Sequence, residues 1–299
     1  MTKHEGRETI LVTGSTGTVG KEVVKKLALS SSDHNVTIRA AVHSKNKDNK
    51  FNQYQAVETV NMDYNNLETI ANALIQVDKL FLLILATPNM TDIYSNLVKE
   101  IKKQGRINHI VMLSSMAVEI KPRTTTGLLH RQGEKIIEES GIPYTFLRPS
   151  GFMQNFVNYL GETIRNQNAF YIPAGIGQVS FIDVRDIASV SAQALSDNRH
   201  MGMAYTITGQ EALSYGQAAE ILSKESGKGI SYVYIAEEDY RKEMKEIGMD
   251  DMFIDLTIEF YSIIRAGYAS QTTDTVEKIT GRKPIRFTQF AKDYAKYFR

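Results

Sequence analysis

Short apolar runs alternate with segments of helical periodicity along the first half of the chain. Strands are predicted where apolar and β-branched residues cluster, at residues 9–13, 36–42, 57–60, 79–86, 109–113 and 143–147. Helices are predicted between them, where apolar residues recur at helical spacing, at residues 19–27, 67–75, 94–103 and 133–140. This alternation is typical of the α/β class and predicts a doubly wound, Rossmann-type parallel sheet with helices on both faces.

The pattern becomes less regular in the second half. Helices are predicted at residues 155–166, 187–195, 216–226 and 252–264, and an extended segment at residues 180–184. The chain contains no repeat, no low-complexity tract and no proline-rich linker. We therefore expect a Rossmann-type domain over residues 1–155, to which residues 179–208 return, and a smaller C-terminal α/β lobe over residues 156–299.

The composition excludes several classes of protein. The formal net charge of +1 provides no field that would attract nucleic acid or an anionic membrane, so neither is expected as a partner. The absence of cysteine excludes disulfides, thiolate metal sites and cysteine nucleophiles. The six histidines are scattered and form no metal-binding motif, so no metal site is expected.

The distribution of apolar residues indicates the cellular compartment. The first eight residues lack the apolar core of a signal peptide. The longest apolar run, Leu80 to Ala86, is far shorter than the roughly 20 residues that a membrane span requires. We therefore expect a cytoplasmic protein, either a monomer or a homodimer.

A glycine-rich turn follows the first predicted strand and opens the first predicted helix. Its spacing is Gly14-x-x-Gly17-x-x-Gly20. In this context the first glycine permits a tight turn, the second lets the backbone approach a pyrophosphate, and the third lets helix and strand pack closely. The helix N-terminus favours the negative charge of phosphate groups. The other residues predicted to contact the cofactor in this loop are Ser15, Thr16, Thr18 and Val19.

A glycine-rich turn is also compatible with two alternatives to a dinucleotide loop. The first is a glycine-rich turn that binds no ligand, which the flanking strand and helix argue against. The second is a Walker A loop, which requires glycine where Ser15 stands and Ser or Thr where Glu22 stands. Neither requirement of the Walker A motif is met, so the turn is predicted to bind a dinucleotide.

The end of the second strand indicates which dinucleotide is bound. NAD-binding proteins place a carboxylate there for the ribose 2′-hydroxyl, yet residues 36–47 contain no Asp or Glu. His43, Ser44 and Lys45 stand there instead, which favours the 2′-phosphate of NADP(H) over NAD(H). The alternative is a solvated basic loop. Asp63, after the third strand, either reaches the adenine amino group or caps the following helix.

Four segments in order resemble the NmrA-like branch of the atypical short-chain dehydrogenases, which includes NADPH-dependent quinone and azo-dye reductases. These segments are the glycine loop, residues 140–155 (SGIPYTFLRPSGFMQN), residues 180–188 (SFIDVRDIA) and residues 280–291 (TGRKPIRFTQFA). The resemblance covers nearly the whole chain. It implies a sheet of about seven strands and a C-terminal substrate lobe.

The resemblance also implies further cofactor contacts at the carboxyl ends of the strands. Residues 86–88 would line the nicotinamide ribose, Ser114 and Ser115 would border the active site, and residues 149–152 would pass beside the nicotinamide carboxamide. These segments contain Ala86, Thr87, Pro88, Pro149, Ser150, Gly151 and Phe152.

The acid that ordinary short-chain dehydrogenases use is missing. None of the fifteen tyrosines has a lysine four residues later. At the matching helix, His130 and Glu134 are spaced i, i+4 and can hydrogen-bond, an arrangement that resembles several NmrA-like reductases. Either His130, with a pKa near neutrality, is a proton donor or substrate contact oriented by Glu134, or the pair only stabilises the helix.

An apolar group follows the sixth predicted strand. Met153 and Phe156, together with Phe152 and Tyr159, either line an apolar substrate pocket or belong to the core. The main hypothesis is an NADPH-dependent oxidoreductase that transfers hydride to a quinone, an azo compound or a similar conjugated small-molecule acceptor. The alternative is a non-enzymatic regulator that binds NADP(H) as a redox sensor and signals through a protein partner.

Overall fold

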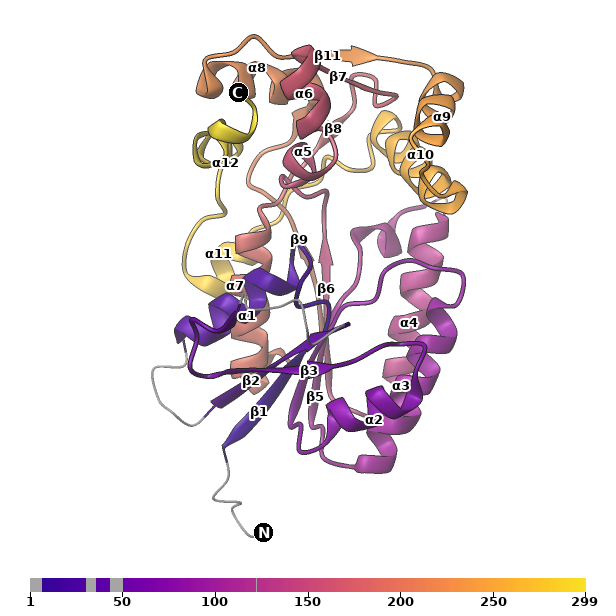
Figure 1. Cartoon of the computed structure of the whole chain (residues 1–299), viewed down its shortest axis with the longest axis vertical. Coiled ribbons are helices and arrows are strands. Elements are labelled where there is room, and N and C mark those ends of the chain that lie inside the picture. The colour runs from indigo at the N-terminus through magenta and orange to yellow at the C-terminus, as the bar shows by residue number, and fades with distance from the viewer. Residues whose placement is uncertain (1–6, 31–35, 44–50, 122) are drawn as a thin grey trace. The chain divides into compact units, whose positions relative to one another are not determined.

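The computed structural model describes residues 7–30, 36–43, 51–121 and 123–299 (Figure 1). The chain divides into two compact units. The first unit comprises residues 1–118, 128–148 and 187–205, and the second comprises residues 119–127, 149–186 and 206–299. The expected boundary at residue 155 thus lies seven residues beyond the change of unit after Arg148, and the segment that returns to the first unit is shorter than expected.

A seven-stranded parallel sheet forms the centre of the first unit (Figure 1). Its strand order is β3-β2-β1-β4-β5-β6-β9. The strands are β1 (Glu8–Val12), β2 (Val36–Val42), β3 (Val57–Asn61), β4 (Lys79–Leu82), β5 (His109–Leu113), β6 (Tyr144–Pro149) and β9 (Met203–Ile207). The doubly wound fold predicted from the sequence is confirmed, because β1 lies beside both β2 and β4 in parallel register and the strand order reverses there.

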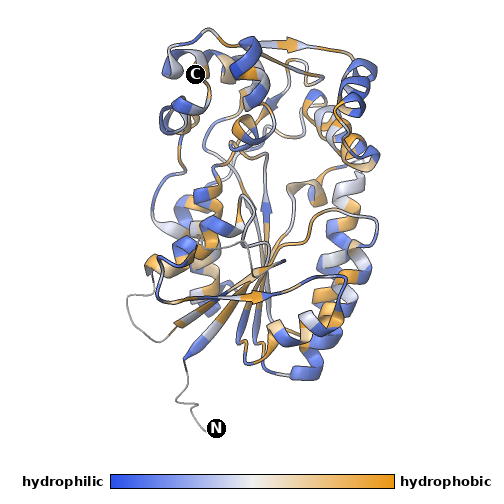
Figure 2. Ribbon diagram, viewed as in Figure 1, coloured by the Kyte–Doolittle hydropathy of each residue, from blue (hydrophilic) through white to orange (hydrophobic). Residues whose placement is uncertain are grey.

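Amphipathic helices cover both faces of this sheet. The helices are α1 (Gly20–Ser30), α2 (Leu67–Leu74), α3 (Met90–Gln104), α4 (Thr125–Ser140) and α7 (Val184–Ser196). In Figure 1, α2, α3 and α4 lie on one side of the sheet, and α1 and α7 lie on the other. Figure 2 shows hydrophobic and hydrophilic residues alternating along these helices, as one buried face requires.

A buried polar cluster lies at the amino ends of the central strands. The Lys79 ammonium group donates to the Leu195 carbonyl at 2.7 Å and pairs with Glu8 at 2.8 Å. The Thr145 hydroxyl donates to the His200 carbonyl at 2.7 Å, so His109 Nε2 must donate to Thr145 across their 2.9 Å contact. This leaves His109 Nδ1 buried without a hydrogen-bond partner. Burial, followed by the charge of Lys79, lowers the pKa of His109 from 6.5 to about 4.

The second unit is built around an aromatic core. Phe156 meets the rings of Phe170, Phe181 and Phe287 at centroid distances of 5.8, 5.3 and 5.1 Å. Around this core lie α5 (Asn155–Asn158), α6 (Gly161–Gln167), β7 (Ala169–Ile172), β8 (Gln178–Val179), β10 (Leu213–Ser214), α8 (Tyr215–Ser226), β11 (Ser231–Tyr234), α9 (Glu237–Glu246), α10 (Asp251–Arg265), α11 (Thr275–Thr280) and α12 (Phe287–Asp293).

Some elements differ from their predicted bounds. The helix predicted over residues 155–166 is two short helices, because the Leu160 N–H bonds to the Asn155 carbonyl and closes a wider turn before α6 begins. The predicted extended segment at 180–184 contains no strand: β8 ends at Val179, and Ile182 forms only an isolated bridge with Phe152. Asp183 accepts a hydrogen bond from the Arg185 N–H, and α7 begins at Val184. In the described ranges, no helix has the length and hydropathy that a membrane span requires.

Candidate functional site

The loop between β1 and α1 has the geometry of a phosphate-binding turn. Gly14 adopts a left-handed conformation with φ of +61°, and its carbonyl accepts the Gly17 N–H at 3.0 Å. The first helical hydrogen bond runs from the Lys21 N–H to the Gly17 carbonyl at 3.2 Å. The N–H groups of the residues between Gly17 and Lys21 therefore belong to the first turn, where anions bind at helix N-termini.

The three glycines of this loop differ in what a side chain would meet. A Cβ at Gly20 would overlap the Gly14 carbonyl oxygen and would lie 2.9 Å from Ser15 Cα, so backbone packs directly on backbone. A Cβ at Gly17 would meet only the Gly14 oxygen, at 3.3 Å, and Gly17 is exposed. The fold therefore requires glycine at position 20. At Gly17, by contrast, an added Cβ would approach a single protein atom.

The hydroxyl groups near the loop differ in burial and in hydrogen-bond partner. Ser15 is buried, and its hydroxyl donates to the Ala41 carbonyl of β2 at 2.5 Å, so it anchors the loop to the sheet. Thr16 is exposed and Thr18 is half-buried. Thr13, which the sequence does not identify as a site residue, accepts the Leu83 N–H with its hydroxyl at 2.8 Å and joins the ends of β1 and β4. A threonine at a strand end gives no sequence signal for this contact.

The carboxyl ends of β2 and β3 bring together two of the residues predicted to select the cofactor. His43 Nδ1 lies 3.9 Å from an Asp63 carboxylate oxygen, and the His43 side chain is 80% exposed. Asp63 does not cap α2; Asn66 does so, by accepting the Glu68 N–H at 3.0 Å. The helix-cap alternative for Asp63 is therefore wrong. Ser44 and Lys45, with which His43 was predicted to contact the 2′-phosphate, lie outside the described residues.

The segment after β4 leaves the sheet before α3 begins. Ala86 and Thr87 are half-buried and Pro88 is exposed. The Thr87 hydroxyl donates to Asn89 Oδ1 at 3.0 Å, and the Thr87 carbonyl accepts the Met90 N–H at 3.0 Å. These contacts order the turn at the same edge of the sheet as the glycine loop, where the cofactor contacts were predicted.

Glu134 is the centre of a buried network in the first unit, defined by Ser114, Arg131, Glu134 and Arg148. The Glu134 side chain is fully buried. It accepts the Ser114 hydroxyl at 2.7 Å, and Arg148 Nε and Nη2 at 2.9 and 2.7 Å. Arg131 Nη1 donates to the same carboxylate at 3.2 Å. The network joins α4 to the carboxyl ends of β5 and β6, where Ser115 accepts the Ala117 N–H at 3.2 Å.

The expected hydrogen bond between His130 and Glu134 is absent from this network. The Glu134 carboxylate accepts its hydrogen bonds from the Arg148 guanidinium and the Ser114 hydroxyl instead. His130 Nδ1 is buried and has no hydrogen-bond partner. Burial lowers the pKa of His130 from 6.5 to about 4, against the opposing effect of the Glu134 charge. The expectation of a His130 pKa near neutrality is therefore wrong: at neutral pH the imidazole is uncharged.

The segment after β6 belongs to the second unit. Pro149 and Ser150 are buried, and Ser150 Oγ accepts the Ser180 hydroxyl at 3.1 Å. Gly151 and Phe152 are half-buried. A Cβ at Gly151 would lie 3.1 Å from Val179 and Phe260 side chains, so this glycine permits close packing.

Met153 and Phe156, the predicted substrate contacts, lie within the core of the second unit. Their exposed fractions are 1% and 0%. Phe156 is surrounded by other aromatic rings of that core, whereas Tyr159 is 57% exposed. This burial favours the core alternative for Met153 and Phe156, and we do not include them in the site proposed below.

The fold and the glycine loop define a Rossmann-type dinucleotide-binding protein. The chain belongs to the NmrA-like family, whose model matches residues 6–288. It is 35% identical over 289 residues to an NAD(P)H azoreductase of Xenophilus azovorans, covering 97% of this chain and 99% of that enzyme.

Two solved structures share the fold over nearly the whole chain. The triphenylmethane reductase of Citrobacter sp. complexed with NADP(H) superposes with a TM-score of 0.82 at 26% identity, covering 96% of this chain and 99% of the reductase. The negative transcriptional regulator NmrA in complex with NADP gives a TM-score of 0.78 at 15% identity, covering 98% and 96%. The second likeness is one of fold alone.

The different environments of Gly17 and Gly20 give a direct test of the loop. Gly17→Val should still fold, because an added Cβ at this exposed residue would meet only the Gly14 carbonyl oxygen, at 3.3 Å, whereas a Cβ at Gly20 would overlap that oxygen. It should nevertheless lose measurable NADPH binding in a fluorescence titration, because the side chain fills the space of the pyrophosphate. Gly20→Val, the matched control, should fail to fold. Wild-type affinity in Gly17→Val would show that the loop does not bind phosphate.

The two buried histidines should make the protein sensitive to acid. Both have a folded pKa of about 4 against 6.5 unfolded, so the unfolded chain binds more protons between these values and stability falls as pH drops through that window. Lowering the pH from 7 to 5 should cost about 2 kcal/mol of unfolding free energy for each histidine.

Urea unfolding at both pH values would measure this loss. His109→Gln and His130→Gln should each reduce the difference in unfolding free energy between pH 7 and pH 5 by about 2 kcal/mol, whatever their absolute stability. A variant that keeps the full wild-type difference would show that its histidine does not titrate in this window.

Proposed function

We propose that this protein is an NADPH-dependent reductase that transfers hydride to an azo compound, a quinone or a cationic dye. The observation that carries the proposal is the loop geometry, in which the exposed Gly17, whose added Cβ would meet only the Gly14 carbonyl oxygen, stands beside the first turn of α1. The 35% identity to an NAD(P)H azoreductase, which extends over 97% of this chain, supports the reaction class.

The proposed cofactor site uses the carboxyl ends of the strands. The first turn of α1 binds the pyrophosphate through backbone N–H groups. His43, with Ser44 and Lys45 beside it in the sequence, binds the 2′-phosphate of NADPH in preference to the NADH hydroxyl. Asp63 then either accepts from the adenine amino group or holds His43 through their 3.9 Å contact. We keep residues 86–88, Ser114, Ser115 and residues 149–152 as further cofactor contacts in this proposal.

The chemistry needs little from the side chains. NADPH supplies the hydride, so the chain must bind and orient the cofactor and exclude water. The proposal includes an atypical short-chain dehydrogenase without the Tyr-x-x-x-Lys pair, in which no side chain delivers a proton during hydride transfer. A neutral His130 cannot act as an imidazolium acid at neutral pH, but it can offer a hydrogen bond to the acceptor. Glu134 is occupied by Ser114 and Arg148 and is no longer a candidate acid.

Acceptors that take hydride without prior protonation suit such a site. A cationic dye becomes neutral on receiving hydride, and a quinone can be protonated by water afterwards. The alternative, a regulator that binds NADP(H) without turnover, has the support of a structure 15% identical in sequence, a likeness of fold alone. No contact in the described ranges favours it over the reductase.

Cofactor oxidation against a panel of acceptors tests the proposal. The purified protein should oxidise NADPH with an azo dye, a triphenylmethane dye or a quinone. Its dissociation constant for NADPH should be lower than that for NADH by more than about tenfold, the effect of one or two charge-assisted contacts. Equal dissociation constants for NADPH and NADH would show that the loop after β2 does not contact the 2′-phosphate. Binding of NADPH without turnover on any acceptor would favour the regulator.

His130 is tested by steady-state kinetics. His130→Ala should lower turnover by less than about a hundredfold, below the full contribution of an essential general acid, and should leave NADPH affinity unchanged. Because its pKa is about 4, wild-type turnover should show no His130 ionisation between pH 6 and 8. Unchanged kinetics in His130→Ala would remove this residue from the site. Retained turnover in Glu134→Gln, a near-isosteric control, would confirm that Glu134 acts as no acid.

A further inference from the structure

Residues 149–155, which carry proposed cofactor contacts, are tied to the segment before α7. Gln154 is buried, and its side-chain amide donates to Asp183 at 3.0 Å and accepts the Val184 N–H at 3.1 Å. Backbone bonds reinforce this link, since the Met153 N–H donates to the Ile182 carbonyl at 2.9 Å. The conformation of residues 149–155 therefore depends on the position of residues 182–184.

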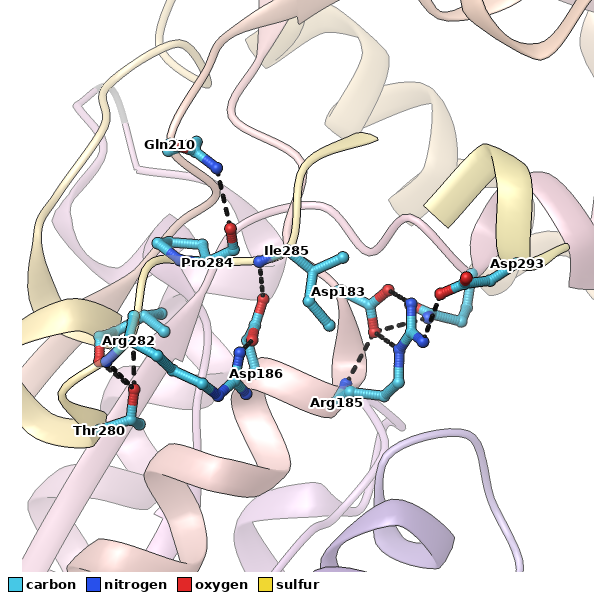
Figure 3. Close-up of polar contacts among 11 residues, drawn as sticks. Asp183, Arg185, Asp186, Gln210, Thr280, Arg282, Pro284, Ile285 and Asp293 are labelled. Carbon is cyan, nitrogen blue, oxygen red and sulfur yellow. Dashed lines mark hydrogen bonds and ion pairs between the residues drawn. The ribbon is translucent and has the colours of Figure 1, made fainter. Parts of the chain in front are cut away.

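Asp183 connects this segment to the C-terminal helix (Figure 3). Its fully buried carboxylate accepts Arg185 Nε at 2.9 Å and Arg185 Nη2 at 2.7 Å. The remaining terminal nitrogen of Arg185, Nη1, donates to Asp293 at 2.6 Å, at the end of α12. A continuous chain of polar contacts thus runs from Gln154 to Asp293, entirely within the second unit.

Asp186 holds the preceding part of the C-terminal segment (Figure 3). Its carboxylate accepts the Ile285 N–H at 2.7 Å and lies 2.6 Å from Arg282 Nη1. Gln210 adds a hydrogen bond from its amide to the Pro284 carbonyl at 2.9 Å. Together these contacts fix the stretch between α11 and α12, which contains few apolar residues of its own.

The buried Asp186 carboxylate is poorly suited to stabilising the fold. Burial raises the pKa of Asp186 above its ordinary value in spite of Arg282 and the Ile285 N–H, so the charged form is disfavoured inside the protein. Replacing buried ion pairs by apolar residues is often neutral or stabilising. Helix α12 is already attached by Phe287, whose ring meets Phe156 at 5.1 Å and Phe181 at 5.8 Å. The Asp186 carboxylate therefore fixes the geometry of the C-terminal segment more than it adds stability.

We propose that the C-terminal segment, residues 280–293, sets NADPH affinity through this clasp, defined as Gln154, Asp183, Arg185, Asp186, Arg282 and Asp293. The clasp residues are positioning residues, since they act on the cofactor through residues 149–152. The inference rests on the proposed function, in which residues 149–152 contact NADPH. It also accounts for the two adjacent sets of contacts that join residues 180–188 to the other two motifs: Asp183 and Arg185 connect Gln154 to Asp293, and Asp186 contacts Arg282 and Ile285.

The first test is Asp186→Asn. The amide oxygen can still accept the Ile285 N–H, but the ion pair with Arg282 is lost. The dissociation constant for NADPH should rise by about tenfold, while turnover at saturating NADPH should stay within about twofold of the wild type. Ile172→Val, a conservative change in the buried strand β7, is the control: it should lower thermal stability without changing NADPH affinity.

A second pair of variants keeps the test decisive if Asp186→Asn does not fold. Asp293 is partly exposed, and Asp293→Asn removes the charge of the outer contact while Arg185 keeps its pair with Asp183. It should weaken NADPH binding by about threefold to tenfold, and Asp293→Glu should restore affinity. Wild-type affinity in every clasp variant, with wild-type protein that binds NADPH, would overturn the clasp alone. A wild-type protein that does not bind NADPH would overturn both the clasp and the proposed function. Because the readout is NADPH binding, it does not depend on finding an acceptor.

Discussion

The direct contact between Gly20 and the Gly14 backbone is the constraint on which the proposed site depends. A Cβ at Gly20 would overlap the Gly14 oxygen, so α1 can begin this close to β1 only with glycine there. The position of the first turn of α1 then determines which backbone N–H groups face the ligand. Ser15 fixes the same loop from the other side, through its hydrogen bond to Ala41 of β2. The glycine loop is therefore held in place by backbone packing and by a buried hydroxyl.

Buried carboxylates join separate segments of the chain within each unit. Glu134 joins α4 to β5 and β6 in the first unit, and Asp183 and Asp186 join three separated motifs in the second. In each case the partner is an arginine with further hydrogen bonds, which is the arrangement that makes a buried charge tolerable. Residues 180–188 are one of the segments that carry the family resemblance. Their carboxylates and Arg185 contact one another and the C-terminal segment.

The sequence was sufficient to predict the sheet and the loop, because both depend on local patterns. The bounds of β2 and β5 agree with the predicted strands, and the glycine spacing gave the turn. The roles of polar residues could not be predicted in the same way. Spacing put His130 and Glu134 on one helix face, but the partner of Glu134 is Arg148, which is adjacent only after β6 has paired with β5. Likewise, Met153 and Phe156 have the spacing of a pocket and of a core alike, and only their packing separates the two.

The state of His130 constrains which reactions the proposed site can perform. The imidazole is buried and its charged form is disfavoured, so a substrate that must be protonated before it accepts hydride would find no acid there at neutral pH. An acceptor whose positive charge or conjugated carbonyls already draw electrons does not need that proton. The same burial leaves His130 Nδ1 without a hydrogen-bond partner among the described residues. Under the proposed function, the neutral state of His130 therefore favours electron-poor conjugated acceptors over simple carbonyl compounds.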